Sequence, residues 1–492
     1  MRDFTVFDLF VRNAAIKPSA VAICSGQYNL DFRELHDRCE QLAGQLAMDG
    51  IKKGDRIAVL AFNHPGFYIL FGAVAKLGAI LVPLNWRLAA GELDYILQDC
   101  QPKLLYCDSN QHAIARQIAE PPQIDVVQLD QLMGDMSNTP PHPLHQSEIN
   151  NETPLCIIYT AAVEGVPRGA VLSHGNLLSA NLQVIVAMGL TADDAYLAML
   201  PLFHITGMNL ALAVLQQGGK NVVMEKFDEK EALRLSLAEN ITLWGSFPPI
   251  LSRMADAIIQ SDKKPTSLQY VVGLDGPDAI QSFEKLIGAR FWILYGQSET
   301  SGFVTFSPAT DRPGTAGKQG PLSIFQLVDD NDQPVPHGTT GEITVRGPLV
   351  FQGYWKQDAL NARTFRNGWH HTGDLGMIDD QGYLVFKGRK PEKELIKPGG
   401  ENVYPAEVEA VIMQHPAIDA VSVIGVPDPK FGEGVKAVCV LRPEAVITAA
   451  ELIEFVGARI ARYKKPGYVE FVEFLPMIEG KIDRESVKKM YG

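Results

Sequence analysis

Apolar residues alternate between helical and strand spacing along the first part of the chain. They recur at helical spacing over residues 5–15, while the short apolar runs at 21–23 and 57–60 are typical of buried strands. Residues 73–85 predict a helix that Gly78 stops, followed by another buried strand. Alternating helices and strands predict an α/β fold with a large layered lobe.

The same reading extends to the end of the chain. Apolar runs predict further strands at residues 155–159, 271–273, 291–294, 418–426 and 435–441. The turn signal at 379–382 predicts a hairpin, and Pro405 predicts the start of a helix. With a further helix predicted at 449–462, the last part of the chain is expected to form a small α+β unit. Residues 120–153 show little periodicity and are interpreted as a surface connection, with a binding role as the alternative.

Composition narrows the class of protein. The chain has 492 residues and a net charge of −13, and it carries no run of lysine and arginine, which argues against nucleic-acid binding. Its six cysteines lack CxxC spacing, so reduced thiols in a cytoplasmic protein are expected rather than disulfides or a metal site. We predict no signal peptide, because the first residues lack a charged n-region, an apolar core and a cleavage site, and no transmembrane segment, because no apolar stretch is long and uninterrupted enough.

Motifs with chemical meaning gather between residues 372 and 409. Thr372-Gly373-Asp374 presents a carboxylate on a glycine turn, which suits it to accept both hydroxyl protons of a ribose. Gly388-Arg389 and the segment ELIKPGGENVYPAEVE at 394–409 follow, and the paired glycines allow close backbone approach to a ligand. In this order and spacing the motifs resemble the adenylate-forming superfamily of acyl-CoA synthetases, aryl-CoA ligases, nonribosomal adenylation domains and luciferases.

The resemblance implies how the chain is divided. It implies an AMP-binding adenylation domain over residues 1–387, a hinge linker at 388–394 and a mobile C-terminal domain over 395–492. The expected fold class is therefore α/β, with a large multi-layer N-terminal lobe and a small mobile α+β C-terminal domain. Two spacings depart from the usual pattern. The linker has two extra residues before Lys393, and the spacer before Gly480 is one residue shorter, so the hinge position is left open.

The loop after the strand at 155–159 departs from the phosphate-binding pattern T-S-G-T-T-G. Here it reads TAAVEG at 160–165, so hydroxyl donors to the phosphates are lost while backbone N–H donors survive. Arg168 replaces the usual lysine and can bind phosphate bidentately. We interpret Glu164 as pointing away, because a carboxylate ~5 Å from a phosphate charge costs roughly 3 kcal/mol. The alternative is that it binds magnesium.

The resemblance implies a nucleotide site drawn from several motifs. The residues expected to bind ATP and AMP are Thr160, Arg168, Gly276, Pro277, Tyr295, Gly296, Ser298, Asp374 and Arg389. Tyr295 offers an aromatic ring that can stack on adenine, and Glu299 offers a carboxylate for Mg²⁺. The segment at 273–277 matches only in part, because Leu274 and Asp275 replace small residues.

Catalytic and acyl-binding residues are implied in the same way. Lys481, in the terminal motif that serves adenylation, His204 and Glu299 are the expected catalytic residues. A lone histidine on an apolar segment is otherwise a buried core residue, which is the alternative for His204. Residues expected to line the CoA tunnel are Lys397, Gly399 and Gly400. Candidates for the acyl pocket wall, with ordinary core as the equal alternative, are Met208, Trp244, Phe247 and Leu274.

These residues predict one reaction class. A carboxylate is already ionised at neutral pH, so its attack on the α-phosphate of ATP needs charge stabilisation rather than a general base. We expect an ATP-dependent acyl-CoA synthetase that activates a fatty or aromatic carboxylate through acyl-AMP and then forms the CoA thioester. ATP, Mg²⁺ and CoA are the expected cofactors, and a homodimer is left open. The alternatives are adenylation of a carrier protein and a non-catalytic nucleotide- or acyl-CoA-binding protein.

Overall fold

The computed structural model describes residues 4–26, 28–120, 123–134, 149–160, 167–390, 395–429, 431–478 and 481–492. The substituted part of the phosphate loop at 161–166, which includes Glu164, lies outside the described residues, as does the linker segment 391–394. Lys481 is described by its backbone alone.

The large lobe contains two mostly parallel sheets. The first has strand order β14-β13-β12-β11-β9-β10-β1-β2 and the second β17-β8-β7-β4-β3-β5-β6. The strands of the first are β1 (Val21–Ser25), β2 (Tyr28–Asp31), β9 (Ala195–Ala198), β10 (Lys220–Val223), β11 (Leu243–Ser246), β12 (Tyr270–Gly273), β13 (Arg290–Tyr295) and β14 (Thr305–Pro308). Those of the second are β3 (Arg56–Leu60), β4 (Ile80–Pro83), β5 (Leu104–Cys107), β6 (Asp125–Gln128), β7 (Pro154–Thr160), β8 (Arg168–Ser173) and β17 (Gly353–Tyr354).

Helices cover both faces of these sheets. One apolar cluster joins the inner faces of both sheets to α1 (Val6–Ile16), α2 (Phe32–Met48), α3 (Pro65–Leu77), α6 (His174–Met188) and α7 (Ile205–Gln217). The outer face of the first sheet packs on α8 (Glu229–Ala238), α9 (Ile250–Ser261) and α10 (Pro277–Ile287). The outer face of the second packs on α4 (Ala90–Cys100) and α5 (His112–Ala119). The result is a layered α/β lobe, as the alternating pattern predicts.

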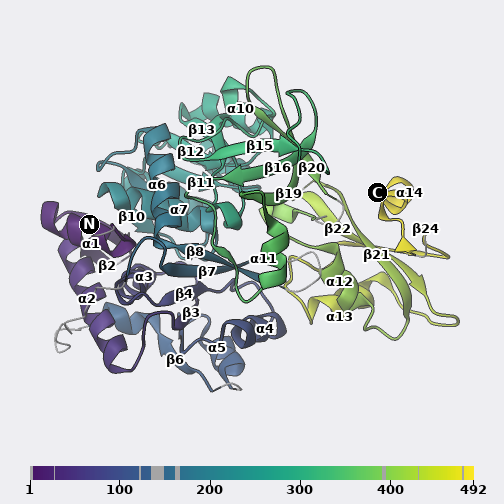
Figure 1. Ribbon diagram of the computed structural model, residues 1–492, viewed down its shortest axis with the longest axis horizontal. Coiled ribbons are helices and arrows are strands. Elements are labelled where there is room, and N and C mark those ends of the chain that lie inside the picture. Colours follow the sequence, from purple (N-terminus) through teal and green to yellow (C-terminus); the bar gives the residue numbers. More distant parts are fainter. Residues whose placement is uncertain are drawn as a thin grey trace.

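A third sheet joins the large lobe to the small one (Figure 1). It consists of β15 (Ile324–Val328), β16 (Gly341–Arg346), β18 (Phe365–Arg366), β19 (Trp369–Ile378) and β20 (Leu384–Arg389), with α11 (Asp358–Thr364) beside it. The small lobe follows with α12 (Pro405–Ile412), β21 (Ile418–Asp428), β22 (Gly432–Leu441), α13 (Ala449–Gly457) and β23 (Tyr468–Val472). A hairpin of β24 (Met477–Ile478) and β25 (Lys481–Ile482) precedes α14 (Arg484–Tyr491). Short 3₁₀ helices lie at η1 (Leu129–Met133), η2 (Ser298–Thr300), η3 (Ala309–Asp311) and η5 (Pro398–Gly400).

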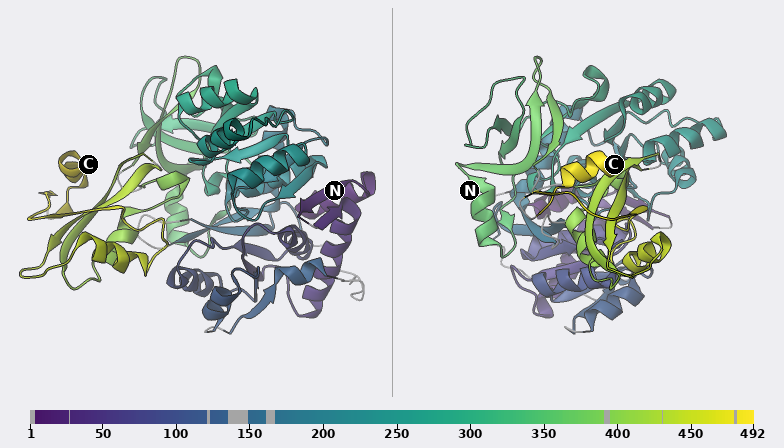
Figure 2. Two further views of the ribbon diagram at one scale, coloured as in Figure 1. Left: turned by 180° about the vertical axis from the view of Figure 1, so that it is seen from behind. Right: turned by 90° about the vertical axis from the view of Figure 1, so that its right-hand side faces the viewer.

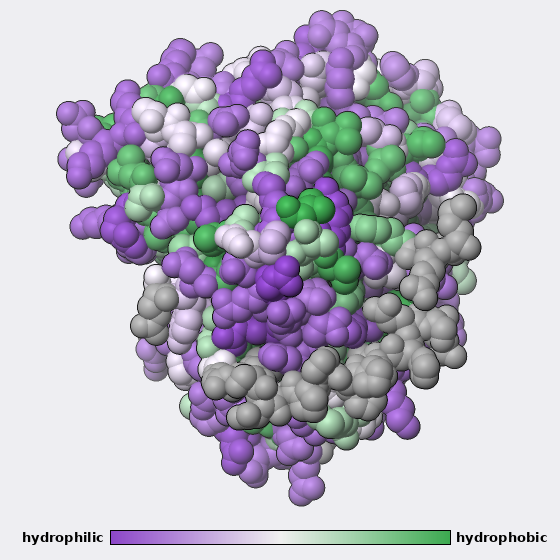
Figure 3. All heavy atoms as spheres, turned by 90° about the vertical axis from the view of Figure 1, so that its left-hand side faces the viewer, coloured by the Kyte–Doolittle hydropathy of each residue, from purple (hydrophilic) through white to green (hydrophobic). Residues whose placement is uncertain are grey.

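The predicted fold class is confirmed, with local corrections. Residues 125–133 are not a plain surface connection, because β6 extends the second sheet at its edge and η1 buries Leu129. Arg168 and Gly169, expected in a loop, begin β8 because they pair with β7. The helix predicted at 449–462 ends at Gly457. The left view of Figure 2 shows the small lobe at one end of the molecule, and the face in Figure 3 mixes hydrophilic and hydrophobic residues. Within the described ranges, every helix is too short or too polar to span a bilayer.

Gly273 ends β12 where the strand passes close to β11. A Cβ added there would lie 1.6 Å from the Ser246 carbonyl oxygen, whereas one added at Gly276 in the following turn meets nothing within 4 Å. We expect Gly273→Ala to lower the free energy of unfolding by about 1–3 kcal/mol and Gly276→Ala to change it little. Urea unfolding of both variants measures the difference, and equal stability would contradict the close approach.

Candidate active site

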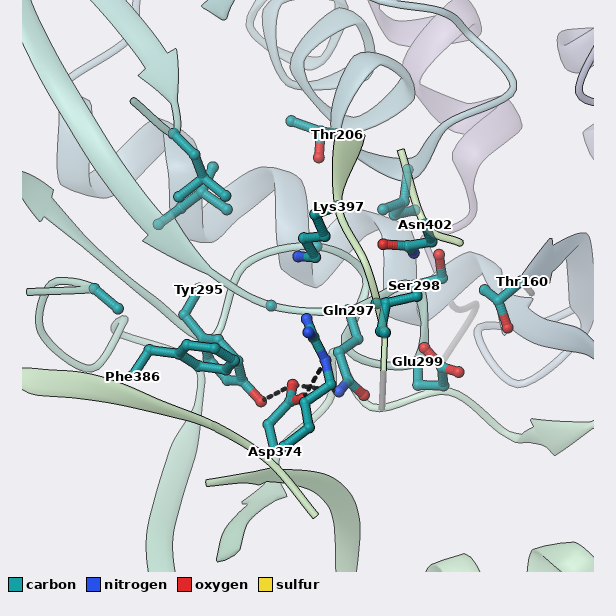
Figure 4. A pocket seen from close by; sticks show the side chains of 18 of the residues that line it. Thr160, Thr206, Tyr295, Gln297, Ser298, Glu299, Asp374, Phe386, Lys397 and Asn402 are labelled. Atoms are coloured by element: carbon teal, nitrogen blue, oxygen red, sulfur yellow. Dashed lines mark hydrogen bonds and ion pairs between the residues drawn. The ribbon is translucent and has the colours of Figure 1, made fainter. Parts of the chain in front are cut away.

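A cavity of about 320 Å³ lies between the large lobe and the small lobe (Figure 4). The structure brings twelve of the predicted residues to its wall. They are Thr160, Arg168, His204, Phe247, Leu274, Tyr295, Gly296, Ser298, Glu299, Asp374, Arg389 and Lys397. These residues come from segments far apart in the chain, so the fold brings the predicted motifs together at one place in space.

Asp374 is held in the cavity floor by groups from several elements. Gly373, in the left-handed region at φ 69°, turns β19 so that the Asp374 carboxylate faces the cavity. Its Oδ2 accepts hydrogen bonds from the Tyr295 hydroxyl at 2.9 Å and from Nε2 of Gln297 at 2.6 Å. Arg389 Nε lies 3.1 Å from its Oδ1. Burial and the nearby Asp374 charge raise the pKa of Tyr295. The arrangement fixes a buried carboxylate next to an aromatic ring.

Glu299 occupies the other side of the cavity, on η2 directly after β13. Its side chain is buried, and Oε1 accepts a hydrogen bond from the Tyr354 hydroxyl at 2.8 Å. Burial, and then the Glu299 charge, raise the pKa of Tyr354. The Arg168 guanidinium lies 6.0 Å from the centre of the Tyr354 ring. A positive and a negative group therefore face the same part of the cavity, which suits a phosphate together with its counterion.

The donor set around Glu299 fits Mg²⁺. Magnesium in proteins is commonly bound by one or two carboxylates together with substrate phosphates, rather than by a cage of protein ligands. Among the described residues no group of three or more histidine, cysteine, aspartate or glutamate side chains could hold a metal alone. The single buried carboxylate of Glu299, beside Arg168, matches the first kind of site.

His204 stands where this cavity meets a second one. The second cavity, also about 320 Å³, is lined on the large lobe by Trp86, Arg87 and Arg253, among others, and His204 and Phe247 line both cavities. The His204 ring accepts a hydrogen bond at Nδ1 from the Thr206 backbone, 3.4 Å away, at the start of α7. Burial lowers its pKa. A largely neutral imidazole therefore lies at the junction, rather than in a closed core as the alternative proposed.

The small lobe completes both cavities. Lys397 and Asn402 line the first, while Gly399 and Glu401 line the second. Gly399 has a φ of +58°, and a Cβ there would lie 3.4 Å from the Pro248 carbonyl oxygen of the large lobe. Burial, and next the Arg389 charge, lower the pKa of Lys397 to about 8. The segment predicted to line a tunnel thus faces the large lobe. Gly400 lies beside it in η5.

Several predicted residues lie away from the cavity wall. Trp244 is fully buried on the outer face of its sheet, where its indole N–H donates to Ser236 Oγ at 3.0 Å. Met208 is buried in the core between the sheets. Gly276 and Pro277 are exposed at the start of α10, while Leu274 alone from that turn lines the cavity. In this structure these residues therefore occupy core and surface positions rather than the wall of the first cavity.

Other cavity residues were missed by the sequence reasoning. They are Ile205, Thr206, Gln297, Tyr354, Phe386, Asn402 and Tyr404, among others. Gln297 and Asn402 lie inside motifs already identified, so their neighbours were a usable signal. Phe386 had none, since it is an ordinary hydrophobic residue of a strand; its ring lies 6.2 Å from that of Tyr295.

The strand β25, to which Lys481 belongs, lies on the far side of the small lobe from the cavity. This strand pairs with β24, and Figures 1 and 2 show this hairpin at the outer end of the lobe. In this arrangement the lobe presents Lys397 and Gly399 to the large lobe and turns β25 away.

Comparisons with known proteins agree with this geometry. Residues 10–355 match the AMP-binding enzyme family, and 407–480 match the AMP-binding enzyme C-terminal domain. The chain is 34% identical to an indoleacetate–CoA ligase of Aromatoleum aromaticum, covering 97% of this chain and 96% of the ligase. It is 33% identical to a feruloyl-CoA synthase of an Amycolatopsis species, covering 98% of each.

Two structures of o-succinylbenzoate CoA synthetase from Bacillus subtilis are also similar. A double mutant bound with its product analogue OSB-NCoA superposes with a TM-score of 0.88, at 26% identity over 98% of each chain. The same enzyme with its acyl-adenylate intermediate superposes with a TM-score of 0.73, at 26% identity over 99% of each chain. The whole chain thus fits the first arrangement better than the second.

Proposed function

The chain belongs to the AMP-binding enzyme family, as a full-length homologue of the AMP-forming acid–CoA ligases, and from this premise we propose that it converts an aromatic carboxylate into its CoA thioester through acyl-AMP. The observation that carries the proposal is the meeting of two cavities at His204. The first offers a nucleotide site, and the second offers a path for a thiol to the same point.

The first cavity has groups that would hold the nucleotide and would stabilise the negative charge on the departing pyrophosphate. Asp374, oriented by Arg389 and Gln297, accepts the ribose hydroxyls, and the Tyr295 ring offers a face for adenine. Arg168 and Thr160 line the same cavity, where they would face the phosphates and Arg168 would stabilise the departing pyrophosphate. Glu299 would hold Mg²⁺, which when bound neutralises phosphate charge.

The second cavity would admit the pantetheine arm of CoA. Its wall combines Arg87 and Arg253 of the large lobe with Gly399 of the small lobe, and the missing side chain at Gly399 leaves the passage open. Because Nδ1 of His204 accepts the Thr206 N–H and burial lowers the pKa of the ring, the neutral imidazole carries its proton on Nε2, from which it can donate a hydrogen bond at the junction. The better superposition on the product-analogue complex supports assigning this arrangement to thioester formation.

We infer an aromatic rather than a fatty acyl group from the wall and from the relatives. The first cavity, which His204 lines, is also lined by Phe247, Leu274 and Ile205, whose rings and branched chains suit a flat apolar group. The two relatives described above are named for indoleacetate and ferulate, both aromatic acids. The test is carboxylate-dependent pyrophosphate release from ATP, with and without CoA, over aromatic, short and long-chain acids. Release with fatty acids alone would overturn the aromatic assignment, and no release with any acid would overturn the ligase activity.

Lys397 gives a prediction about pH. Below about pH 8 its ammonium carries a charge next to Arg389 and Asp374, and above that pH the charge is lost. If this charge stabilises the adenylate during thiol attack, the contribution of Lys397 to kcat/KM for added acyl-AMP falls as pH rises through about 8, because kcat/KM reports the free enzyme. Lys397→Met should lower the rate roughly 10- to 100-fold at pH 7 and remove this fall. Thiol ionisation raises both rates with pH, so the ratio of wild type to variant isolates the lysine, and a pH-independent ratio would contradict its role.

A further inference from the structure

A buried ammonium group joins the two lobes at a point outside both cavities. Lys464, which follows α13 in the small lobe, lies with Nζ 2.6 Å from Glu92 Oε1 of the large lobe and 2.8 Å from Glu407 Oε2 of its own lobe. The Lys464 side chain is only 3% exposed, and its charge is compensated by a carboxylate from each lobe.

Glu92 holds the small lobe by more than this ion pair. Its Oε2 accepts the backbone N–H of Ala461, 2.8 Å away in the small lobe, and the backbone N–H of Ala89 at the start of α4, also 2.8 Å away. One carboxylate therefore caps a helix of the large lobe and binds the small lobe at two points. The fixed direction of the two contacts specifies how the lobe is turned.

The charge balance at Lys464 depends on the orientation of the lobe. Burial lowers its pKa, but Glu407 and Glu92 outweigh burial and the net pKa is raised. Glu407 moves with the small lobe, whereas Glu92 belongs to the large lobe. Turning the lobe would therefore leave the ammonium with one carboxylate fewer, and Glu92 would lose both of its small-lobe donors.

The same stretch of the large lobe forms the wall of the second cavity. Arg87, five residues before Glu92, pairs with Glu401 of the small lobe and lines that cavity, with its guanidinium 4.7 Å from the centre of the Trp86 ring. Glu401 lies two residues after Gly399, which lines the cavity too. A lobe held at Glu92 is thus held with Gly399 and Glu401 in the position that completes the thiol path.

We propose that Lys464 is a positioning residue that, through Glu92, holds the small lobe in the orientation for thioester formation. The proposal rests on the proposed function, in which that orientation serves the second half of the reaction. Lys464 contacts neither cavity, so its effect reaches the chemistry only through the position of the lobe.

The test separates the two half-reactions in Glu92→Gln. Glutamine keeps an oxygen to accept the Ala89 N–H but removes the charge that binds Lys464. We expect thioester formation from added acyl-AMP and CoA to slow about tenfold, which corresponds to about 1.4 kcal/mol, while acyl-AMP formation stays unchanged. Glu470→Gln is the matched control, since it breaks an ion pair of 2.8 Å between Lys436 and Glu470 within the small lobe. It should alter neither half-reaction.

Small-angle X-ray scattering provides a readout that does not depend on activity. The Glu92→Gln profile should shift away from the arrangement described here, and the Glu470→Gln profile should not. Unchanged half-reactions together with an unchanged profile would overturn the proposal, as would an equal loss of both half-reactions with a lower Tm. A wild-type protein that makes no thioester would overturn the proposed function instead, and the scattering comparison would still decide whether Glu92 holds the lobe.

Discussion

Asp374→Ala is expected to lower kcat/KM for ATP by roughly 10²- to 10⁴-fold, since hydrogen bonds to a charged acceptor contribute about 1.5–3 kcal/mol each and a ribose makes two. Asp374 is buried and already oriented by Tyr295, Gln297 and Arg389, so its carboxylate is fixed in place before a ribose binds. Steady-state pyrophosphate release at varied ATP measures the loss.

A nucleotide analogue distinguishes ribose binding from a general loss of structure. For the wild type, changing ATP to 2′,3′-dideoxy-ATP should lower kcat/KM about as much as the Asp374→Ala substitution does with ATP. For Asp374→Ala, the same change of nucleotide should lower kcat/KM little further. If the variant loses the same large factor with the dideoxy nucleotide, Asp374 acts on something other than the ribose. Asp379→Ala is the matched control, because Asp379 lies in the turn of the same hairpin. The substitution removes a carboxylate whose Oδ2 lies 2.9 Å from Arg312 Nε. Its kcat/KM for ATP should stay close to that of the wild type.

The site could be predicted from the sequence where its residues lie inside contiguous motifs. Asp374 lies within β19 directly after the glycine turn, and Glu299 follows β13 on η2; each belongs to a short run whose turn and spacing are local properties, and both line the first cavity. The layered fold follows in the same way, because the apolar periodicity of each element is local.

Side-chain direction is what the sequence could not supply. β11 is covered by helices on both faces, so its apolar run does not reveal that Trp244 faces α8 and the outer core while Phe247, beyond the strand end, reaches the cavity. The contact between Lys464 and Glu92 joins residues 372 positions apart, in segments without a shared motif. Such contacts depend on how the lobes are docked, which no local pattern encodes.

Lys481→Ala is expected to slow acyl-AMP formation by roughly 10²- to 10³-fold, the usual cost of removing one group that stabilises developing charge. The lysine belongs to the terminal motif whose resemblance implies a role in adenylation. In this structure β25 lies at the outer end of the small lobe, so Lys481 can act at the first cavity only after the lobe turns about the linker.

That geometry predicts that the two half-reactions separate in the variant. Thioester formation from added acyl-AMP and CoA should stay within about twofold of wild type, because the arrangement that completes the second cavity leaves Lys481 outside. Lys489→Ala, which removes an exposed lysine from the neighbouring α14, is the matched control. It should leave the rates of both half-reactions unchanged. An equal loss of both halves in Lys481→Ala, without loss of folding, would mean that one orientation of the small lobe serves the whole reaction. The contacts of Glu92 with Lys464 and Ala461 would then hold the lobe for both half-reactions rather than favour one of them.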